Sequence, residues 1–258
     1  MKNPYAVETV RIKKCVNEAP DVRTLLLDKK MDFNPGQFVM VSLLGFGESA
    51  ISISSYPDLQ ITFRRAGNVT NALFEKCTGD EIGLRGPFGK PYPLNEIAGK
   101  HILLASGGCG IAPIRSLLKY YLLNENSFSG ASLFFGARNP SMILYKNELK
   151  EWRKSFEVHL TVDQANSEWE GNVGVVSLLL EEFKLPANAA AVVCGPSIMI
   201  KSVAETLGKK GMPESDMIVS LERNMRCGLG KCGRCNIAEK FVCLDGPNFR
   251  WSDIKWRV

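Results

Sequence analysis

Four cysteines near the carboxyl end constrain this chain more than any other feature of its sequence. They are Cys227, Cys232, Cys235 and Cys243. Their spacing is C-x4-C-x2-C, followed after seven further residues by the fourth cysteine, which is the plant-type ligand spacing of a [2Fe-2S] cluster. Structural zinc sites instead pair C-x2-C with a second such pair or with histidines. The two histidines, His101 and His159, lie far away in the sequence, so the spacing favours an iron–sulfur cluster, with zinc or free thiols as the alternative.

Length and composition indicate an ordinary globular protein with more than one domain. The chain has 258 residues, of which 45% are hydrophobic and 23% charged, and single domains usually span about 100–200 residues. No apolar run reaches the length of about 20 residues that a membrane span needs, so we expect no membrane insertion. The start of the chain leads into no signal-peptide core. We therefore expect a cytoplasmic protein whose eight cysteines are free thiols or metal ligands.

The charge of the chain is modest and unevenly distributed. A net charge of +5 is too small to indicate a nucleic-acid partner. Residues 221–258 hold eight basic and four acidic side chains, and a cluster with four thiolates is anionic, so basic neighbours are physically reasonable. The same residues could instead form a solvated tail or a surface for an acidic partner.

The first ninety or so residues read as short strands separated by turns. Apolar residues recur over 6–16, 23–28, 37–44, 50–56, 59–65 and 81–84. Strands at this spacing predict a small antiparallel β-barrel. One helix is expected over 71–77, with Thr70 as its N-cap.

From His101 onward the pattern changes to alternating strands and helices. Apolar runs at 102–106, 132–137, 157–162, 190–194 and 217–221 alternate with helical patterns at 113–123, 144–154, 176–183 and 197–209. This alternation predicts a parallel sheet with helices on both faces. We therefore expect three parts, namely a β-barrel over 1–97, an α/β domain over 98–220 and a small cluster segment over 221–258.

Two strand-to-helix junctions of the α/β domain have the composition of nucleotide-binding turns. The first contains Gly108, Gly110 and Pro113, and glycines there allow the helix amides to face a pyrophosphate. The second is Cys194-Gly195-Pro196. Ligands of parallel sheets bind beyond the carboxyl ends of the strands, so both turns could face one crevice. Arg138 follows another strand of the sheet, where a ribose or its phosphate would reach, which favours NADPH slightly. Each turn could also serve packing alone, and Arg138 could be an ordinary surface arginine.

The barrel half offers weaker signals when its residues are taken alone. Ser52 lies on a strand that could simply be half exposed. Gly67 to Thr70 lead into the expected helix, where free amides could hold a phosphate.

Taken together, these motifs resemble the ferredoxin–NADP reductase superfamily, in its branch of electron-transfer subunits with a C-terminal [2Fe-2S] cluster. The segment 220–235 with 241–249 is most similar to the γ subunit of sulfhydrogenases, and related subunits serve dihydroorotate dehydrogenase B and anaerobic sulfite reductase. The resemblance implies an FAD-binding barrel, a parallel-sheet NAD(P)-binding domain and a cluster segment. The flavin motif R-x-Y-S of the family appears here as Ser49-Ala-Ile51-Ser52, so Ile51 is expected against the flavin ring.

The same resemblance implies particular site residues. For FAD they are Ile51, Ser52, Arg64, Gly67, Val69 and Thr70. For NAD(P) they are Gly108, Gly110, Pro113, Arg138, Cys194, Gly195 and Pro196. Ser52 would lie near the flavin N5 atom and Cys194 near the nicotinamide, and no residue is expected to act as general acid or nucleophile.

The expected function is a relay of electrons among NAD(P)H, FAD and the [2Fe-2S] cluster, to or from the catalytic and iron–sulfur subunits of a larger oxidoreductase such as a hydrogenase. The chain would be a diaphorase-type NAD(P)H oxidoreductase subunit. One alternative is a self-contained NAD(P)H oxidoreductase with a soluble acceptor. Another is the electron-transfer subunit of dihydroorotate dehydrogenase or sulfite reductase, and a third is a zinc-binding redox-regulatory module.

Overall fold

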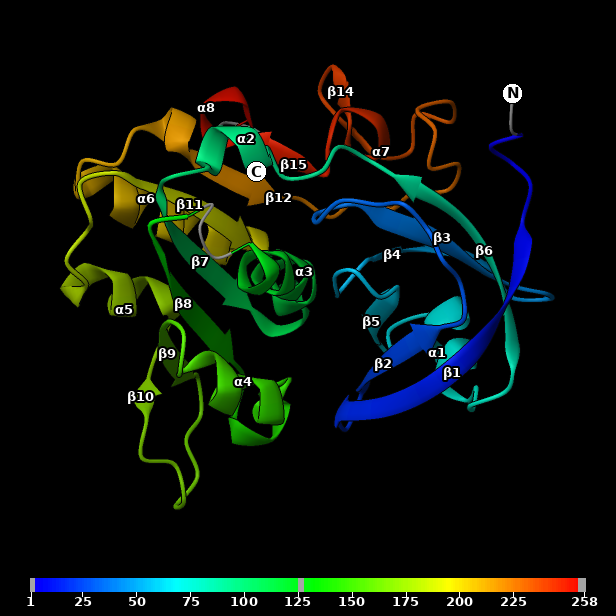
Figure 1. The fold of residues 1–258 in the computed structure, drawn as a ribbon, viewed down its shortest axis with the longest axis horizontal. Helices are drawn as coiled ribbons and strands as arrows, with labels where there is room; N and C mark the ends of the chain where they lie inside the picture. The colour runs from blue at the N-terminus through cyan, green and yellow to red at the C-terminus, as the bar shows by residue number, and fades with distance from the viewer. Residues whose placement is uncertain (1–2, 125–127, 255–258) are drawn as a thin grey trace.

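The alternating apolar residues of the first ninety positions form an antiparallel barrel, as predicted. The computed structural model describes residues 3–124 and 128–254. Six strands pair in the order β4-β3-β6-β1-β2-β5. They are β1 (Glu8–Ala19), β2 (Val22–Leu27), β3 (Phe38–Leu43), β4 (Gly47–Ser52), β5 (Gln60–Arg64) and β6 (Glu81–Phe88). A bridge between Ile53 and Ile61 brings the two edge strands together and curls the sheet around its own core (Figure 1).

The helix after β5 begins earlier than the sequence suggested. Helix α1 spans Asn68–Phe74 and its N-cap is Gly67, not Thr70. Thr70 lies inside the first turn, where its hydroxyl oxygen accepts hydrogen bonds from the N–H groups of Ala66 and Gly67, both at 3.0 Å. The prediction of Thr70 as N-cap was wrong because this hydroxyl bonds backward along the chain, as the distal residue of a capping box does.

The second half forms the predicted parallel sheet, with one antiparallel strand added at its edge. Seven strands pair in the order β10-β9-β8-β7-β11-β12-β15, and β15 alone runs antiparallel, against β12. They are β7 (His101–Gly107), β8 (Gly130–Ala137), β9 (Glu157–Val162), β10 (Asn172–Val173), β11 (Ala189–Cys194), β12 (Met217–Ser220) and β15 (Asn248–Arg250).

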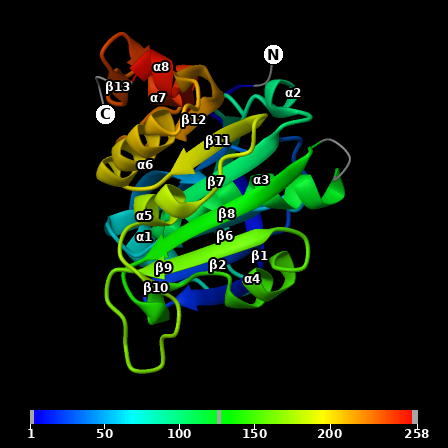
Figure 2. The same cartoon turned by 90° about the vertical axis from the view of Figure 1, so that its left-hand side faces the viewer.

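Helices cover both faces of this sheet, because successive residues of each strand point to opposite sides. On β7, Leu104 packs with helices α3 (Ile111–Leu123) and α4 (Lys146–Trp152), whereas Leu103 packs with α5 (Val176–Glu182) and α6 (Ser197–Lys209). Helix α3 lies between the sheet and the barrel (Figure 1). Figure 2 shows α5 and α6 on the opposite face. A short helix α2 (Leu94–Ile97) lies between β6 and β7 along the chain.

The residues after β12 form a small segment that lies against both halves of the molecule. It contains a hairpin of β13 (Asn236–Ile237) and β14 (Lys240–Phe241), helix α7 (Val242–Asp245), β15 and helix α8 (Trp251–Ile254). Because β15 extends the parallel sheet, this segment shares a core with it. The proposed boundaries at 97 and 220 stay predictions.

One buried side chain joins the three parts of the chain. Asn248 donates from its amide nitrogen to the carbonyl of Gly36 in the barrel at 3.0 Å and to that of Lys90 at 2.8 Å. Its amide oxygen accepts from Ser220 at 2.6 Å. Gly36 has a φ of +92° and a Cβ there would lie 2.5 Å from the Asn248 amide nitrogen, so the junction requires glycine at this position. Among the described residues, no helix is long and apolar enough to cross a membrane.

Candidate flavin, nucleotide and iron–sulfur sites

A cavity of about 260 Å³ lies between the barrel and the start of helix α3. Four residues predicted to contact FAD line its barrel side, namely Ile51, Ser52, Arg64 and Thr70. Pro113, predicted from the dinucleotide turn, lines the opposite side. The fold therefore places residues from both predicted sites around one space.

The lining of this cavity combines apolar walls with positive charge, as a flat aromatic ring carrying phosphates would require. Ile51 and Phe38 are buried apolar residues, whereas Arg64 and Arg223 are exposed cations. Two predicted residues lie apart from this lining. Gly67 caps α1, and its N–H is bonded to Thr70, while the side chain of Val69 lies near Gly47 in the adjacent hairpin.

A second cavity, of about 420 Å³, lies beyond the carboxyl ends of the parallel strands, where parallel sheets bind their ligands. Gly108, Arg138 and Pro196 line it, as predicted residues from three different strand ends. Ser106, at the end of β7, has a buried hydroxyl that finds no partner within the described residues. A polar ligand at this edge would give that hydroxyl a partner.

The turn from Gly107 to Pro113 is shared between the two cavities. Its first residues line the larger cavity, and Cys109, Ala112 and Pro113 line the smaller one. Gly110 packs so closely on the second predicted turn that a Cβ there would lie 2.2 Å from the carbonyl oxygen of Cys194. This one turn therefore links the two cavities.

The two cysteines of these turns, Cys109 and Cys194, do not ionise readily. Cys194 is buried, and burial raises its pKa well above the usual value. Burial likewise raises the pKa of Cys109 to about 11, with Glu222 and Asp21 adding negative charge nearby. Both groups are therefore neutral thiols at physiological pH. Gly195, next to Cys194, adopts a φ of +158° and lies against the backbone of Gly107.

Sequence reasoning missed the residues that complete both cavities. Leu221, Glu222, Arg223, Met225 and Pro247 form a third wall of the smaller cavity, because β15 folds the cluster segment back onto the sheet. They lie within the segments that carry the family resemblance, but no local motif indicates that they reach this cavity. Asp163 lines the larger cavity beside Arg138. Its position directly after strand β9 was the available signal, since ligand-binding residues follow strand ends.

The four cysteines of the C-terminal motif lie in one loop region, and backbone N–H groups point at the sulfurs of Cys227, Cys235 and Cys243. The Sγ of Cys227 accepts from Leu229 at 3.4 Å and from Lys231 at 3.3 Å. Gly230 donates to the Sγ of Cys243 at 3.1 Å. Such N–H groups stabilise thiolates and tune the potential of a cluster.

The thiols form two pairs. Cys232 contacts Cys227 through its N–H and its thiol, and the thiols of Cys243 and Cys235 are hydrogen bonded to each other. Burial raises the pKa of Cys227, but the surrounding N–H groups outweigh it and lower that pKa to about 6. Burial and the neighbouring Cys235 raise the pKa of Cys243 to about 12. In the described part of the chain, no three His, Cys, Asp or Glu side chains converge as a site for one metal ion. Two thiol pairs with amide donors fit the ligand demand of a two-iron cluster.

The cysteine loop lies close to the smaller cavity. Met225 lines the cavity only two residues before Cys227. Phe38 also lines it and packs on Phe88 with ring centroids 5.9 Å apart. Phe88 in turn lies against Gly228, where a Cβ would be 3.3 Å from the ring. Phe38 and Phe88 therefore lie between the cavity and the cysteine loop.

Comparison with known proteins defines the class. Residues 104–205 match the family model of the oxidoreductase NAD-binding domain, and residues 222–255 match that of the iron–sulfur cluster binding domain of dihydroorotate dehydrogenase B. The solved structure of an NADH-dependent reduced ferredoxin–NADP oxidoreductase, described for flavin-based electron bifurcation, superposes with a TM-score of 0.78 at 28% identity, covering 98% of this chain and 94% of that one. A ferredoxin–NADP reductase from Neisseria gonorrhoeae with bound FAD and NADP shares the fold, with a TM-score of 0.70 at 20% identity, covering 88% of this chain and 96% of that one.

Sequence relatives identify the family more closely. Sulfhydrogenase 2 subunit gamma of Pyrococcus furiosus is 34% identical, covering 97% of both chains. The probable electron transfer subunit of dihydroorotate dehydrogenase B of Methanocaldococcus jannaschii is also 34% identical, covering 94% of this chain and 89% of that one. The chain belongs to the ferredoxin–NADP reductase superfamily, among its electron-transfer subunits with an iron–sulfur segment. This membership confirms the predicted family, and the matched iron–sulfur domain favours a cluster over zinc.

Proposed function

We propose that this chain is the NAD(P)H-linked flavoprotein subunit of a larger oxidoreductase, and that it carries electrons between a nicotinamide, FAD and a [2Fe-2S] cluster. The observation that carries the proposal is the shared cavity. Its walls come from the barrel, from the dinucleotide turn and from the segment that ends in Cys227. A flavin would link the nicotinamide to the cluster, because it accepts an electron pair and releases single electrons.

The chain's own residues bind and orient these groups. Ile51 offers an apolar surface for a ring, and Ser52 lies next to it on the same wall with a hydroxyl. Arg64 supplies charge for phosphates. In the larger cavity, Arg138 and Asp163 are the charged side chains that would meet a ribose or its phosphate. Cys227, Cys232, Cys235 and Cys243 would hold the cluster, with Gly228 and Gly230 allowing the amides to approach.

The partner and the compartment belong to the same proposal. Two relatives are named as a subunit gamma and an electron transfer subunit. These names suggest that the chain forms a complex with catalytic and iron–sulfur subunits. The exposed cations Arg226, Lys231 and Arg234 surround the cysteines and would favour an acidic partner surface. All eight cysteines are free, which supports a reducing compartment, the cytoplasm.

A direct test is to purify the protein anaerobically, measure flavin, iron and sulfide, and add NADH or NADPH. We expect about one FAD, two irons and two sulfides per chain, with flavin absorbance bleached by the coenzyme. Absence of flavin and sulfide, or one zinc in place of iron, would contradict the proposal. Full turnover by the isolated chain with a soluble acceptor such as ferredoxin would select the alternative of a self-contained oxidoreductase.

A further inference from the structure

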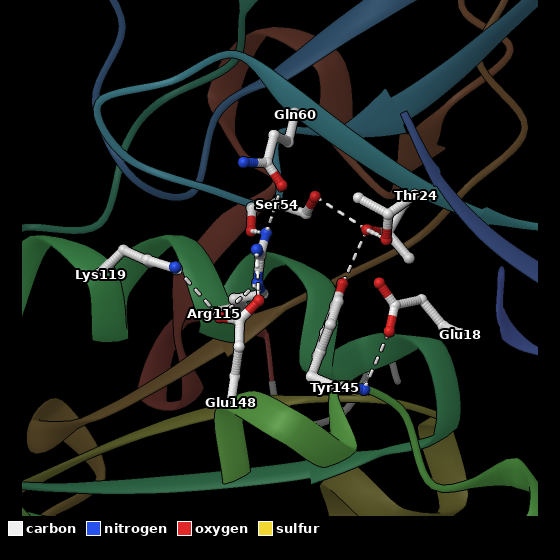
Figure 3. A network of polar contacts seen from close by, with 9 residues as sticks. Glu18, Thr24, Ser54, Gln60, Arg115, Lys119, Tyr145 and Glu148 are labelled. Atoms are coloured by element: carbon white, nitrogen blue, oxygen red, sulfur yellow. Dashed lines mark hydrogen bonds and ion pairs between the residues drawn. The ribbon is translucent and has the colours of Figure 1, made fainter. Parts of the chain in front are cut away.

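A buried arginine outside the lining of the smaller cavity connects the barrel wall of that cavity to the wall formed by the start of α3. Arg115 lies on α3, and its side chain is only 4% exposed. Its Nη1 donates to the carbonyl oxygen of Ser54 at 2.6 Å and to Oε1 of Gln60 at 3.1 Å, both in the barrel. Its Nη2 and Nε donate to the carboxylate of Glu148 on α4, at 2.6 and 3.0 Å. One guanidinium therefore bridges the two halves of the molecule (Figure 3).

A tyrosine makes a second bridge beside the first. The hydroxyl of Tyr145 donates to Oγ1 of Thr62 on β5 at 2.7 Å, and Thr62 is bonded to Ser54 at 2.8 Å. Tyr145 is buried, and its ring lies 4.7 Å from the Arg115 guanidinium. Its backbone adopts a φ of +55°, a conformation that is costly for a bulky residue and is kept only where the surroundings enforce it.

The sequence positions of these contacts tie them to the site. Arg115 follows Pro113 by two residues, Ser54 follows Ser52 by two, and Thr62 precedes Arg64 by two. Pro113, Ser52 and Arg64 all line the smaller cavity, and so does Thr62 itself. The bridges therefore fasten the dinucleotide turn to the two barrel strands that are proposed to contact the flavin.

The ion pair between Arg115 and Glu148 is better suited to fixing the geometry of the fold than to stabilising it. A buried ion pair contributes little net stability compared with apolar packing, and its best-attested use is to specify geometry. Burial raises the pKa of Glu148, but Arg115 and Lys119 outweigh it and lower that pKa, so the carboxylate stays ionised at neutral pH. The forked guanidinium fixes directions that a lysine cannot.

We propose that Arg115, held by Glu148, is a positioning residue that fixes the separation between the flavin-contacting strands and the dinucleotide turn. This inference rests on the proposed function of the cavity. Reacting atoms must approach to about 3–3.5 Å, and a misplacement of about 1 Å can reduce a rate by about 10²-fold. The larger cavity, in contrast, is lined only by residues from Gly107 to Ser202 of the second half. Loss of the bridge should therefore slow hydride transfer and leave coenzyme affinity unchanged.

The test uses the full-length holoprotein with Arg115→Lys, Arg115→Met and Tyr145→Phe. The matched control is Lys119→Met, which removes a cation from the same Glu148 carboxylate, 3.1 Å away, within the second half. Three quantities are measured: the stopped-flow rate of flavin reduction by NAD(P)H, the dissociation constant of NADP+ or NAD+, and amide hydrogen exchange over residues 52–56 and 108–115.

We expect the Arg115 variants to slow flavin reduction by about 10-fold or more, with a dissociation constant within about twofold of wild type and faster exchange in both segments. Tyr145→Phe, which removes a single hydroxyl, should show the same pattern more weakly, and Lys119→Met should match wild type. Wild-type rates in both Arg115 variants, or slowing that only follows weaker coenzyme binding, would overturn the inference. If the Arg115 variants do not fold, an unchanged rate and exchange in Tyr145→Phe would overturn it. A wild-type protein that binds no flavin would refute the proposed function instead, and unchanged exchange in the variants would then still refute the bridge.

Discussion

Replacing Arg85 should separate the cysteine loop from the barrel. Arg85 lies on β6 with its side chain 5% exposed. Its Nη1 donates to the carbonyl oxygen of Cys227 at 2.8 Å, and its Nε and Nη2 donate to the Glu48 carboxylate at 2.8 and 2.7 Å. This one side chain thus fixes the first predicted cluster ligand against the barrel. Arg85→Gln removes the charge and shortens the side chain.

The magnitude follows from what each variant leaves unpaired. Breaking a buried ion pair costs about 3–5 kcal/mol, and Glu48 is 27% exposed, so we expect about 3 kcal/mol for Arg85→Gln, at the low end. Glu48→Gln keeps the bond from Arg85 to the loop carbonyl but leaves a guanidinium that is 5% exposed without its carboxylate, so about 3 kcal/mol is expected there too. At about 2–4 °C per kcal/mol for a chain of this size, both melting temperatures should fall by about 6–12 °C.

Thermal unfolding of the two variants, followed by circular dichroism, tests these values. Iron release to a chelator provides a second readout, because only Arg85→Gln removes the bond to the carbonyl of Cys227. We expect faster release from that variant than from Glu48→Gln. Equal release of iron from the two variants would refute the reasoning, since the bond to the loop would then contribute nothing.

Three further outcomes are expected. In Cys232→Ser, NAD(P)H should still bleach the flavin while electron delivery to the partner stops, and Cys77→Ser, another exposed cysteine, should behave as wild type; partner reduction at full rate in Cys232→Ser would exclude the cluster from the path. Burial raises the pKa of Glu18, so the protonated carboxyl stabilises the fold at low pH and this stabilisation is lost as the pH rises through the raised pKa. The melting temperature of Glu18→Gln should therefore increase relative to that of wild type from about pH 4 to pH 7. A difference in melting temperature that stays constant with pH would contradict this. Arg138→Gln should weaken NADPH binding by about 10-fold, or about 1.4 kcal/mol, relative to NADH; equal weakening of both coenzymes would show that Arg138 does not read the ribose phosphate.

The sequence predicted those elements whose residues carry their own periodicity. Helix α6 spans Ser197–Lys209, as expected, because its apolar residues recur at helical spacing directly after the turn at Pro196. The four cysteines lie in one loop region as two contacting pairs, and their role as cluster ligands stays a prediction. Strand β15, with three residues, was missed because so short a strand has no period of its own and forms only by pairing with β12.

The site was predictable only where its residues sit in local motifs. Pro113 and Arg138 were predicted because a glycine turn and a strand end mark them, whereas Ser52 was predicted only through the family resemblance; their roles stay predictions. Glu222 could not be predicted, since it reaches the cavity through a segment placed by long-range pairing. Arg115 and Glu148 are separated by 33 residues, and their bridge to the barrel depends on how the two halves dock, which no sequence pattern records.

The junction at Asn248 has a consequence for how the chain is made. Its partners Gly36 and Lys90 lie 212 and 158 residues earlier, and ribosomes deliver chains from the amino end at about 5–20 residues per second. The barrel can fold as it emerges, but its carbonyls at Gly36 and Lys90 wait many seconds for the Asn248 amide that satisfies them. The smaller cavity therefore gains its third wall only after Pro247 has been synthesised, so a ligand that needs all three walls can bind only once the barrel and the sheet have docked.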